Sequence, residues 1–386
     1  MFRFLTAGES HGKGLIAIVE GVPAGLLLSE EYIAKDMARR QKGYGRGGRM
    51  KIEQDRAEII SGVRHGLTLG SPISMSIQNK DWENWKDAMS ITPIEGEVER
   101  VTRLRPGHAD MAGALKYNQQ DVRNVLERAS ARETAARVAV GAVARRFLEE
   151  FGVEIHSHTV ALGQHGVEET EEINWDRVEE SPMRCHDPEM EKLMIAAVDQ
   201  AKEAGDTVGG VFEVVATGVP VGLGSYVHWD RKLDGRIAQA LLSINAMKGV
   251  EMGRGFASTR LPGSQVQDVI EPFDSASERR WRHQTNRAGG IEGGMSNGEP
   301  IVVRVAVKPI STLGKPLPSV DLVTGEKVQA HYERSDVCQV PSAGVVGEAM
   351  LAIVLADAFL EKFGGDHIEE NHRNYEVYLK YLERGG

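Results

Sequence analysis

One stretch decides how this chain folds: SARETAARVAVGAVARRFLEEF, residues 130–151. Its opening, Ser130-Ala131-Arg132-Glu133, matches the S-x-x-E capping box of a helix N-terminus, and the residues that follow are rich in Ala and Val. Small apolar side chains on most faces of a helix indicate that it is buried. The stretch therefore predicts a central, tightly packed helix that begins at Ser130 and ends near Phe151.

The N-terminus of this predicted helix is a candidate anion site. Free backbone N–H groups and the helix dipole favour negative charge there, and Arg128 and Arg132 lie beside it in the sequence. The alternative is that these arginines pair with Glu127 and Glu133 along the helix. This segment alone leaves both interpretations open.

The pattern returns near the C-terminus, where a second, strongly apolar helix is predicted from Ser342 to Phe363. Two shorter stretches recur in the same order, each next to an apolar, strand-like run. Gly21-Val22-Pro23 recurs as Gly218-Val219-Pro220, and Gly70-Ser71-Pro72-Ile73 recurs as Gly298-Glu299-Pro300-Ile301. The order of the matches favours an internal duplication, and chance recurrence of Gly-Val-Pro turns is the alternative.

A duplication predicts one α+β domain over residues 1–386, with halves at about 1–160 and 207–365. The two helices would then be buried between two antiparallel sheets, and a shared site would lie where the halves meet. Residues 164–206 are acidic and weakly periodic, apart from a helix expected around Glu189–Ala204. We interpret them as a peripheral insertion.

The composition is that of an ordinary globular protein, with 386 residues, 41% of them hydrophobic and 26% charged. Cys185 and Cys338 are its only cysteines, too few for a disulfide framework and without metal-ligand spacing. No apolar run is expected to approach membrane-spanning length, and the N-terminus lacks a signal-peptide pattern. We therefore expect a cytoplasmic protein that does not enter a membrane.

The net charge of −10 is unevenly distributed along the chain. Residues 1–150 hold 23 Lys/Arg and 20 Asp/Glu, a balance of +3, so the remaining residues hold 23 and 36, a balance of −13. The segment Arg39–Lys51 has six cationic residues, four glycines and no acidic residue, which indicates an anion site or a disordered basic loop. Nucleic-acid binding is disfavoured, because the remainder is acidic and Tyr44 is the only aromatic residue in this segment.

Further candidate site residues lie on loops. Ser10 and His11 occupy a tight, glycine-bracketed turn, which suits either an active-site loop or a plain surface turn. The segment Arg103–Asp110 combines a Pro-Gly turn with two Arg, a His and an Asp, and Arg334-Ser335-Asp336 precedes the second apolar helix. Residues 286–298 contain enough glycine for close approach to a ligand, or they form a flexible loop.

Together these candidates point to a small ligand with several negative charges. Guanidinium groups match carboxylate and phosphate, whereas the histidines lack metal-ligand spacing, so no metal site is expected. The usual ATP and dinucleotide motifs do not occur in the sequence. The residues alone therefore predict an enzyme that acts on a phosphorylated carboxylic acid. The arginines concerned are Arg40, Arg46, Arg49, Arg105, Arg128, Arg132 and Arg334.

Three segments carry a resemblance to a known family: Gly8-Glu9-Ser10-His11-Gly12 through Pro23, Glu127 through Thr134, and Arg334-Ser335-Asp336 through Met350. They are similar to the signature segments of the chorismate synthase family. Arg39–Arg49 and Arg105–Asp110 resemble that family too. The match runs in the expected order from Met1 to about Phe363, so it is specific.

The resemblance implies a shikimate-pathway enzyme that converts 5-enolpyruvylshikimate 3-phosphate to chorismate and phosphate by an anti 1,4-elimination. The family needs reduced FMN although there is no net redox change, because the flavin lends electron density that loosens the C–O bond and then recovers it. The implied fold is a β-α-β sandwich with the helices inside, assembled as a homotetramer. NADPH is a possible reductant, and the lack of a long extra insertion favours an external flavin reductase. A redox flavoenzyme that consumes NADPH is the alternative.

The resemblance also implies residue roles. His11 would protonate the departing phosphate, His108 would protonate or hydrogen-bond the reduced flavin ring, and Asp336 would act with flavin N5 in removing the ring proton. Imidazole suits such tasks because its unperturbed pKa of about 6.5 is close to working pH. The implied substrate-binding residues are Ser10, Arg46, Arg49, Arg105, Ser130, Arg132 and Arg334. The implied FMN-binding residues are Arg128, Ala129, Ser130, Asn245, Ala246, Gly293, Lys308, Pro309, Ile310, Ser311, Thr312 and Arg334. Arg40 and Arg46 match positions associated with NADPH.

Overall fold

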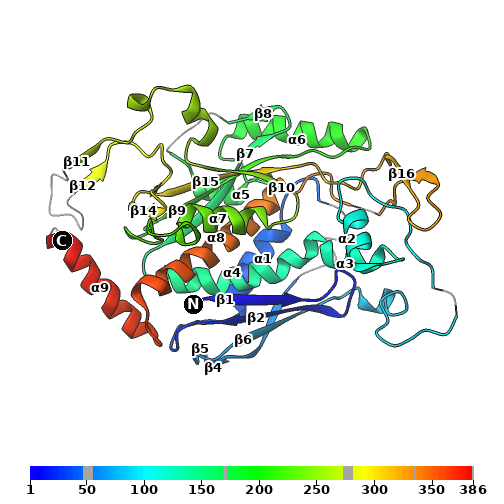
Figure 1. The fold of residues 1–386 in the computed structure, drawn as a ribbon, viewed down its shortest axis with the longest axis horizontal. Helices are drawn as coiled ribbons and strands as arrows, with labels where there is room; N and C mark the ends of the chain where they lie inside the picture. The colour runs from blue at the N-terminus through cyan, green and yellow to red at the C-terminus, as the bar shows by residue number, and fades with distance from the viewer. Residues whose placement is uncertain (47–54, 97, 168–171, 273–280, 334, 385–386) are drawn as a thin grey trace.

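Two antiparallel sheets form the outer layers of the protein (Figure 1). The computed structural model describes residues 1–46, 55–96, 98–167, 172–272, 281–333 and 335–384. The N-terminal sheet has the strand order β1-β2-β6-β3, and the C-terminal sheet has the order β10-β15-β9-β7-β8. Their bounds are β1 Arg3–Ala7, β2 Gly14–Glu20, β3 Ala57–Ser61, β6 Ile73–Gln78, β7 Glu154–Leu162, β8 His165–Gly166, β9 Gly210–Thr217, β10 Met247–Met252 and β15 Ile301–Val307.

Helices fill the space between the sheets, as Figure 1 shows. Helix α4 packs on β2 of one sheet, α8 packs on β7 and β9 of the other, and the two helices pack on each other. The prediction of an α+β protein with antiparallel sheets and buried helices is confirmed. The bounds of the inner helices are α1 Glu30–Gln41, α4 Thr134–Glu149, α7 Leu233–Leu242 and α8 Val340–Phe363.

The crossing of α4 and α8 is close because small residues meet there. In α4, 12 of 16 residues are buried, most of them Ala and Val. A Cβ added at Gly141 would lie 2.3 Å from the Cβ of Ala349 on α8. Any side chain at position 141 would therefore force the two central helices apart.

Both predicted helix starts are wrong by a few residues. Ser130 does act as a cap, since its Oγ accepts from the backbone N of Arg132 at 3.3 Å, but it opens a short 3-10 turn, and α4 begins at Thr134. The carboxylate of Glu133 contacts Arg137 and Thr6 instead of completing a capping box. Helix α8 begins at Val340 rather than Ser342, because proline is well accommodated in a first helical turn.

The expectation that no apolar run approaches membrane-spanning length is also wrong. Helix α8 has 24 residues and is apolar enough to span a bilayer by length and composition. However, 89% of its most apolar window is buried inside the protein, where it packs between the C-terminal sheet and α4. Its hydrophobicity is explained by this central position in the core.

The remaining elements surround these layers. Helices α5 and α6 cover part of the second sheet beside β7 and β8, and α6 matches the helix expected around 189–204. The other bounds are β4 Val63–Arg64, β5 Leu67–Thr68, α2 Asp110–Tyr117, α3 Arg123–Ala129, α5 Trp175–Glu180, α6 Pro188–Glu203, β11 Ile270–Pro272, β12 Trp281–His283, β13 Ile291–Glu292, β14 Met295–Ser296, β16 Pro318–Val320, β17 Lys327–Gln329 and α9 Ile368–Arg384.

Candidate active site

A cavity of about 790 Å³ brings the predicted site residues together from distant parts of the sequence. Its volume is in the range of small-molecule and cofactor sites. It is lined by the β1–β2 loop, the end of α1, the α3–α4 junction, the loops around positions 245 and 310, and the start of α8. The predicted residues that line it are Ser10, His11, Arg40, Arg46, Arg105, His108, Ala129, Ser130, Arg132, Asn245, Ala246, Lys308, Pro309, Ile310, Ser311, Thr312 and Asp336.

Some predicted residues lie elsewhere. Arg128 bonds the carbonyl oxygens of Thr6 and Gly8 and does not line the cavity. Gly293 lies in the turn between β13 and β14, outside the cavity lining. Arg49 and Arg334 fall outside the described residues.

The β1–β2 loop carries Ser10 and His11 into the cavity in a fixed conformation. The backbone N of Ser10 donates to the carbonyl oxygen of Glu127 at 3.0 Å, and Ser130 Oγ donates to Ser10 Oγ at 3.2 Å. His11 Nδ1 lies 2.9 Å from both carboxylate oxygens of Glu127. Both loop residues are buried, so the interpretation of this segment as a plain surface turn is wrong.

The Arg105–Asp110 segment forms a compact ion cluster at the cavity wall. Arg105 donates through Nε to Asp110 at 2.8 Å, and His108 Nδ1 contacts the other oxygen of the same carboxylate. Burial opposes ionisation of Asp110, but hydrogen bonds from His108 and Arg105 outweigh it and lower the pKa of this carboxyl to about 2. Asp110 therefore stays ionised and holds both Arg105 and His108 at the cavity wall.

Three more arginines at the cavity rim are held by protein groups, and each lies within 3.6 Å of a carboxylate. Arg132 lies 2.9 Å from Asp55, and Arg40 donates through Nε to Thr134 Oγ1 at 3.0 Å. Arg46 Nε lies 3.1 Å from the carboxylate of Asp336. Of the pairings of Arg128 and Arg132 with Glu127 and Glu133 that the sequence left open, Arg128 does lie 3.9 Å from Glu133. Arg132 instead faces Asp55, because α4 starts late.

One wall of the cavity is suited to a planar, hydrogen-bonding ring such as a flavin. Asn245 donates through Nδ2 to the carbonyl oxygen of Ala129 at 2.8 Å, while among the described residues no group donates to its buried Oδ1. The next residue, Ala246, has a φ of 73°, a strained conformation for a residue with a Cβ. Lys308 lies nearby, where burial and the charge of Lys248 lower its pKa.

Sequence reasoning missed several residues of this site. Trp85 and Asp81 line the cavity, although neither is among the site residues predicted from the sequence. Asp55 also belongs to the site because it pairs with Arg132, and Glu333 belongs to it because it lines the cavity. The available signal was the pair of tryptophans in Asp81-Trp82-Glu83-Asn84-Trp85, since large aromatics in a loop need a partner to pack against.

Comparison with known proteins identifies the family. The family model described as chorismate synthase matches residues 2–360. The chain belongs to the chorismate synthase family. A chorismate synthase of Aquifex aeolicus is 57% identical over 396 residues, covering 99% of this chain and 98% of the relative. One of Geobacter metallireducens is 58% identical over 395 residues, covering 99% of each chain.

A solved structure described as a crystal structure of chorismate synthase has 47% sequence identity and a TM-score of 0.79, covering 99% of this chain and 98% of that one. The reaction of chorismate synthase is the anti 1,4-elimination of phosphate from 5-enolpyruvylshikimate 3-phosphate, which gives chorismate. The chain is thus a carbon–oxygen lyase of the shikimate pathway and aromatic amino-acid biosynthesis, and it depends on reduced FMN with no net redox change.

Proposed function

We propose that the 790 Å³ cavity is where the elimination takes place, with His11, His108 and Asp336 as the catalytic residues. The observation that carries this proposal is that these three residues, far apart in sequence, border one cavity together with Arg40, Arg46, Arg105, Arg132 and Lys308. A substrate with two carboxylates and a phosphate needs such a set of fixed cations.

The substrate anions would bind the cavity arginines. Arg46, Arg105 and Arg132 offer guanidinium forks already oriented by Asp336, Asp110 and Asp55, so little side-chain entropy is lost on binding. Ser10 and Ser130 add hydroxyl groups between them. Arg49 and Arg334 are proposed for the same role on the strength of the family resemblance.

Each catalytic residue has a separate proton task. His11 delivers a proton to the departing phosphate, which removes charge from the leaving group as the C–O bond breaks. His108 holds a proton toward the flavin ring, and Asp110 contacts its Nδ1. Asp336 takes up the proton that leaves the substrate ring, and its neighbour Arg46 orients the carboxylate.

The cavity wall around Asn245 fits reduced FMN, because the unsatisfied Oδ1 of Asn245 offers an acceptor for a ring N–H. When bound, reduced FMN supplies electron density that loosens the C–O bond to phosphate. Ala129, Ser130, Ala246 and residues 308–312 would complete the binding wall. Arg128, Gly293 and Arg334 stay predictions from the family resemblance.

The source of reduced flavin is a separate proposal. Arg40 and Arg46 lie at the cavity and could hold the phosphate of NADPH as a reductant. However, Arg40 is already bonded to Thr134 and to the carbonyl oxygen of Ala131, which equally suits a rim that clamps substrate. We favour supply by an external flavin reductase, in a cytoplasmic enzyme.

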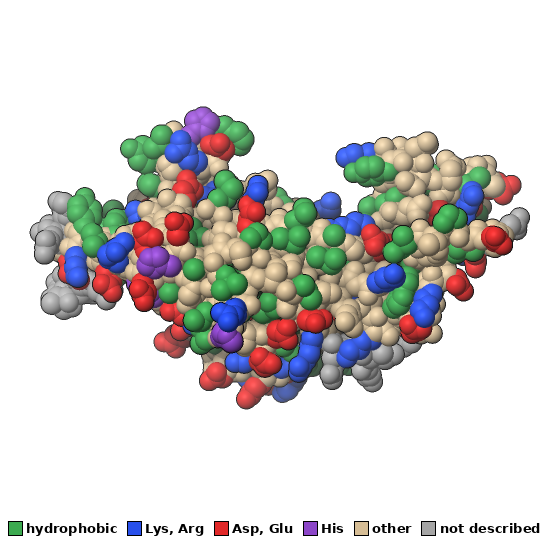
Figure 2. Space-filling view, turned by 90° about the horizontal axis from the view of Figure 1, so that it is seen from below, with side chains coloured by type: hydrophobic (Ala, Val, Ile, Leu, Met, Phe, Trp, Pro, Cys, Tyr) green, Lys and Arg blue, Asp and Glu red, His purple; other side chains and the backbone are tan. Residues whose placement is uncertain are grey.

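A homotetramer is proposed because one sheet exposes apolar side chains on its outer face. On the outer face of the N-terminal sheet, Leu5, Ile16 and Ile18 are 68%, 49% and 40% exposed. Figure 2, seen from below, shows green hydrophobic side chains scattered over the middle of the molecule among uncharged surface. Apolar sheet faces of this kind are usually covered in an assembly. Sedimentation of an Ile18→Glu variant as smaller species, against a tetramer for the unchanged chain, is the expected result.

The internal duplication is also proposed, supported by matching details in the two halves. The order β1-β2-β6-β3 corresponds to β7-β9-β15-β10. Thr68 Oγ1 donates to the carbonyl oxygen of Pro23 at 2.6 Å, and Ser296 Oγ donates to that of Pro220 at 2.6 Å. In an experimental structure, segments 16–147 and 212–360 should superpose, and failure to do so would overturn the duplication. The halves would then be about 1–160 and 207–365, with 164–206 as an insertion in a single domain.

The decisive experiment for the function is anaerobic incubation with reduced FMN and 5-enolpyruvylshikimate 3-phosphate. Chorismate and phosphate should form in equal amounts over many turnovers per flavin. A requirement for one NADPH per product would instead indicate a redox flavoenzyme.

A further inference from the structure

We infer that Glu127 and Trp85 are positioning residues for His11. Glu127 fixes which ring nitrogen of His11 exchanges its proton, and Trp85 fixes the plane of the ring. The inference deepens the proposed acid role of His11 and rests on it. The sequence assigned neither residue such a role: Glu127 lies in a family signature segment and, with Glu133, was considered as a helix partner of Arg128 and Arg132.

Glu127 contacts His11 at two atoms, the backbone N and the ring Nδ1. Its carboxylate accepts from the backbone N of His11 at 2.8 Å and lies 2.9 Å from Nδ1 through both oxygens. The Glu127 side chain is 1% exposed, so water offers Nδ1 little competition. An ionised carboxylate can only accept hydrogen bonds, so Nδ1 must be the donor. The proton that His11 gives up and regains is therefore the one on Nε2.

Trp85 covers one face of the same ring. The two ring centroids are 3.7 Å apart, with an interplanar angle of 25°. Trp85 is held in turn by Asp81, whose carboxylate accepts from the indole Nε1 at 3.0 Å. Asn79, at the start of this segment, donates to the carbonyl oxygen of Gly12 at 2.9 Å. The tryptophan loop is thus tied to the residue next to His11.

Arg123 links Glu127 and Trp85 to each other. It lies one helical turn before Glu127 on α3 and donates to Oε1 of that carboxylate at 3.0 Å. Its guanidinium carbon also lies 5.3 Å from the centre of the Trp85 ring. Arg123 therefore contacts Glu127 and Trp85, both of which contact His11. Such closed sets of contacts restrict the rotation of a catalytic ring and pre-organise it for proton transfer.

The test of Glu127 is the tautomer of His11, read by ¹⁵N NMR of protein labelled at its histidines. The signals of His11 are assigned by their loss in His11→Ala. In the unchanged protein, neutral His11 should carry its proton on Nδ1. In Glu127→Gln the Nε2–H tautomer should appear, and kcat should fall by about 10²-fold with KM changed by less than about 3-fold. Glu127→Asp should restore the Nδ1–H tautomer and part of kcat.

A matched control is Glu133→Gln, which also removes a buried carboxylate but one that contacts Arg137 and Thr6. The His11 tautomer should not change in it. If Glu127→Gln and Glu127→Asp both keep the tautomer of the unchanged protein, the inference for Glu127 is wrong. If instead the tautomer shifts but His11→Ala retains turnover, the acid role of His11 fails while the positioning stands.

The test of Trp85 compares an aromatic replacement, Trp85→Phe, with a truncation, Trp85→Ala. Trp85→Phe keeps a ring against His11 and Trp85→Ala does not, so kcat should be lower in Trp85→Ala than in Trp85→Phe by about 2- to 10-fold, the range expected for one stacked aromatic pair. The loss should appear in kcat at saturating substrate and not in flavin affinity. Equal kcat values for Trp85→Ala and Trp85→Phe would refute the positioning role of the indole.

Discussion

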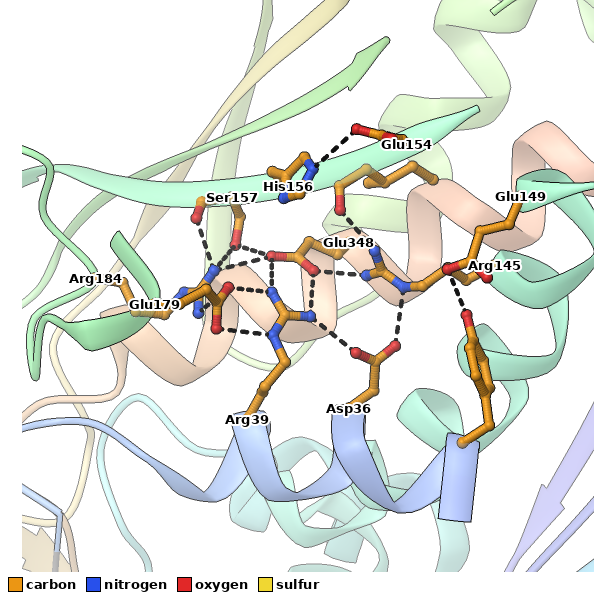
Figure 3. Close-up of polar contacts among 12 residues, drawn as sticks. Asp36, Arg39, Arg145, Glu149, Glu154, His156, Ser157, Glu179, Arg184 and Glu348 are labelled. Carbon is orange, nitrogen blue, oxygen red and sulfur yellow. Dashed lines mark hydrogen bonds and ion pairs between the residues drawn. The ribbon is translucent and has the colours of Figure 1, made fainter. Parts of the chain in front are cut away.

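Two regions of the molecule each bring several arginines together, but the groups around these arginines differ. In the first, shown in Figure 3, the carboxylate of Glu348 on α8 is fully buried. It accepts from Arg39 of α1 at 2.7 and 2.9 Å, from Arg145 of α4 at 2.6 Å and from Arg184 at 3.1 Å. Ser157 of β7 adds a hydrogen bond of 2.6 Å. We call this group the Glu348 cluster.

The second region is the cavity. Arg105 and Arg132 are also paired with carboxylates, Asp110 and Asp55, yet their side chains border about 790 Å³ of space large enough for a ligand. In the Glu348 cluster the arginines meet carboxylates and a hydroxyl of the protein itself, and the cluster joins α1, α4, α8 and β7. The difference teaches that access to a cavity, rather than residue type or ion pairing, separates a ligand-binding arginine from a structural one.

The largest expected effect is on the cavity side of this comparison. His11→Ala should lower kcat by about 10²- to 10⁴-fold, the contribution of a positioned acid, while the affinities for substrate and FMN are kept. Steady-state turnover, isothermal titration and thermal unfolding of the same sample check this. Turnover equal to that of the unchanged chain would remove His11 from the mechanism.

The next effect lies in the Glu348 cluster. Glu348→Gln should lower the free energy of unfolding by about 3–5 kcal/mol, because three arginines whose side chains are only 7%, 12% and 17% exposed lose their shared carboxylate. Denaturant unfolding monitored by circular dichroism measures it. Under conditions where this variant is folded, the KM for the enolpyruvyl substrate should change little. A stable variant with a greatly raised KM would mean that the cluster belongs to the active site.

The pH dependence of stability gives a third comparison. The pKa of Asp110 is lowered from 3.8 to about 2, so this carboxylate is ionised in the folded protein at pH values where the unfolded chain binds a proton. Its contribution is therefore full above pH of about 4 and is lost as the pH falls toward 2, by about 2 kcal/mol in all. Asp110→Asn should flatten the stability profile in this window. An unchanged slope between pH 4 and 2 would contradict the lowered pKa.

Sequence patterns predicted the layers of the fold and much of the cavity, because both depend on local signals. The Ala- and Val-rich stretch at 134–151 and the apolar run before Phe363 mark buried helices wherever they occur. The site loops were recognisable by their glycines and charged residues. The pairing of Arg132 with Asp55 was not predictable, since it joins positions 77 residues apart through tertiary packing.

The basic segment that starts at Arg39 shows most clearly what a sequence leaves out. Arg39 and Arg40 are consecutive residues of the same helix, and nothing in their neighbourhood distinguishes them. Successive side chains on a helix point about 100° apart. As a result Arg39 enters the Glu348 cluster, while Arg40 reaches Thr134 and lines the cavity. The distinction appears only once α1 is packed against both α4 and α8.

These two neighbours allow the smallest and most direct test of the comparison. Lysine keeps the charge but cannot form paired hydrogen bonds. Arg39 donates two bonds to Glu348 and two to Glu179, so Arg39→Lys should lower the free energy of unfolding by about 1–2 kcal/mol and leave KM nearly unchanged.

Arg40→Lys should do the reverse, raising the KM for substrate by up to about tenfold, equivalent to about 1.4 kcal/mol, with a smaller change in stability. Both variants are assayed with chemically reduced FMN, so that any role of Arg40 toward NADPH does not enter the result. If the two variants respond alike, the division of this helix between a structural cluster and a ligand site is wrong. If saturating substrate removes the effect of Arg40→Lys but not that of Arg39→Lys, the boundary between the Glu348 cluster and the cavity runs between these two consecutive residues.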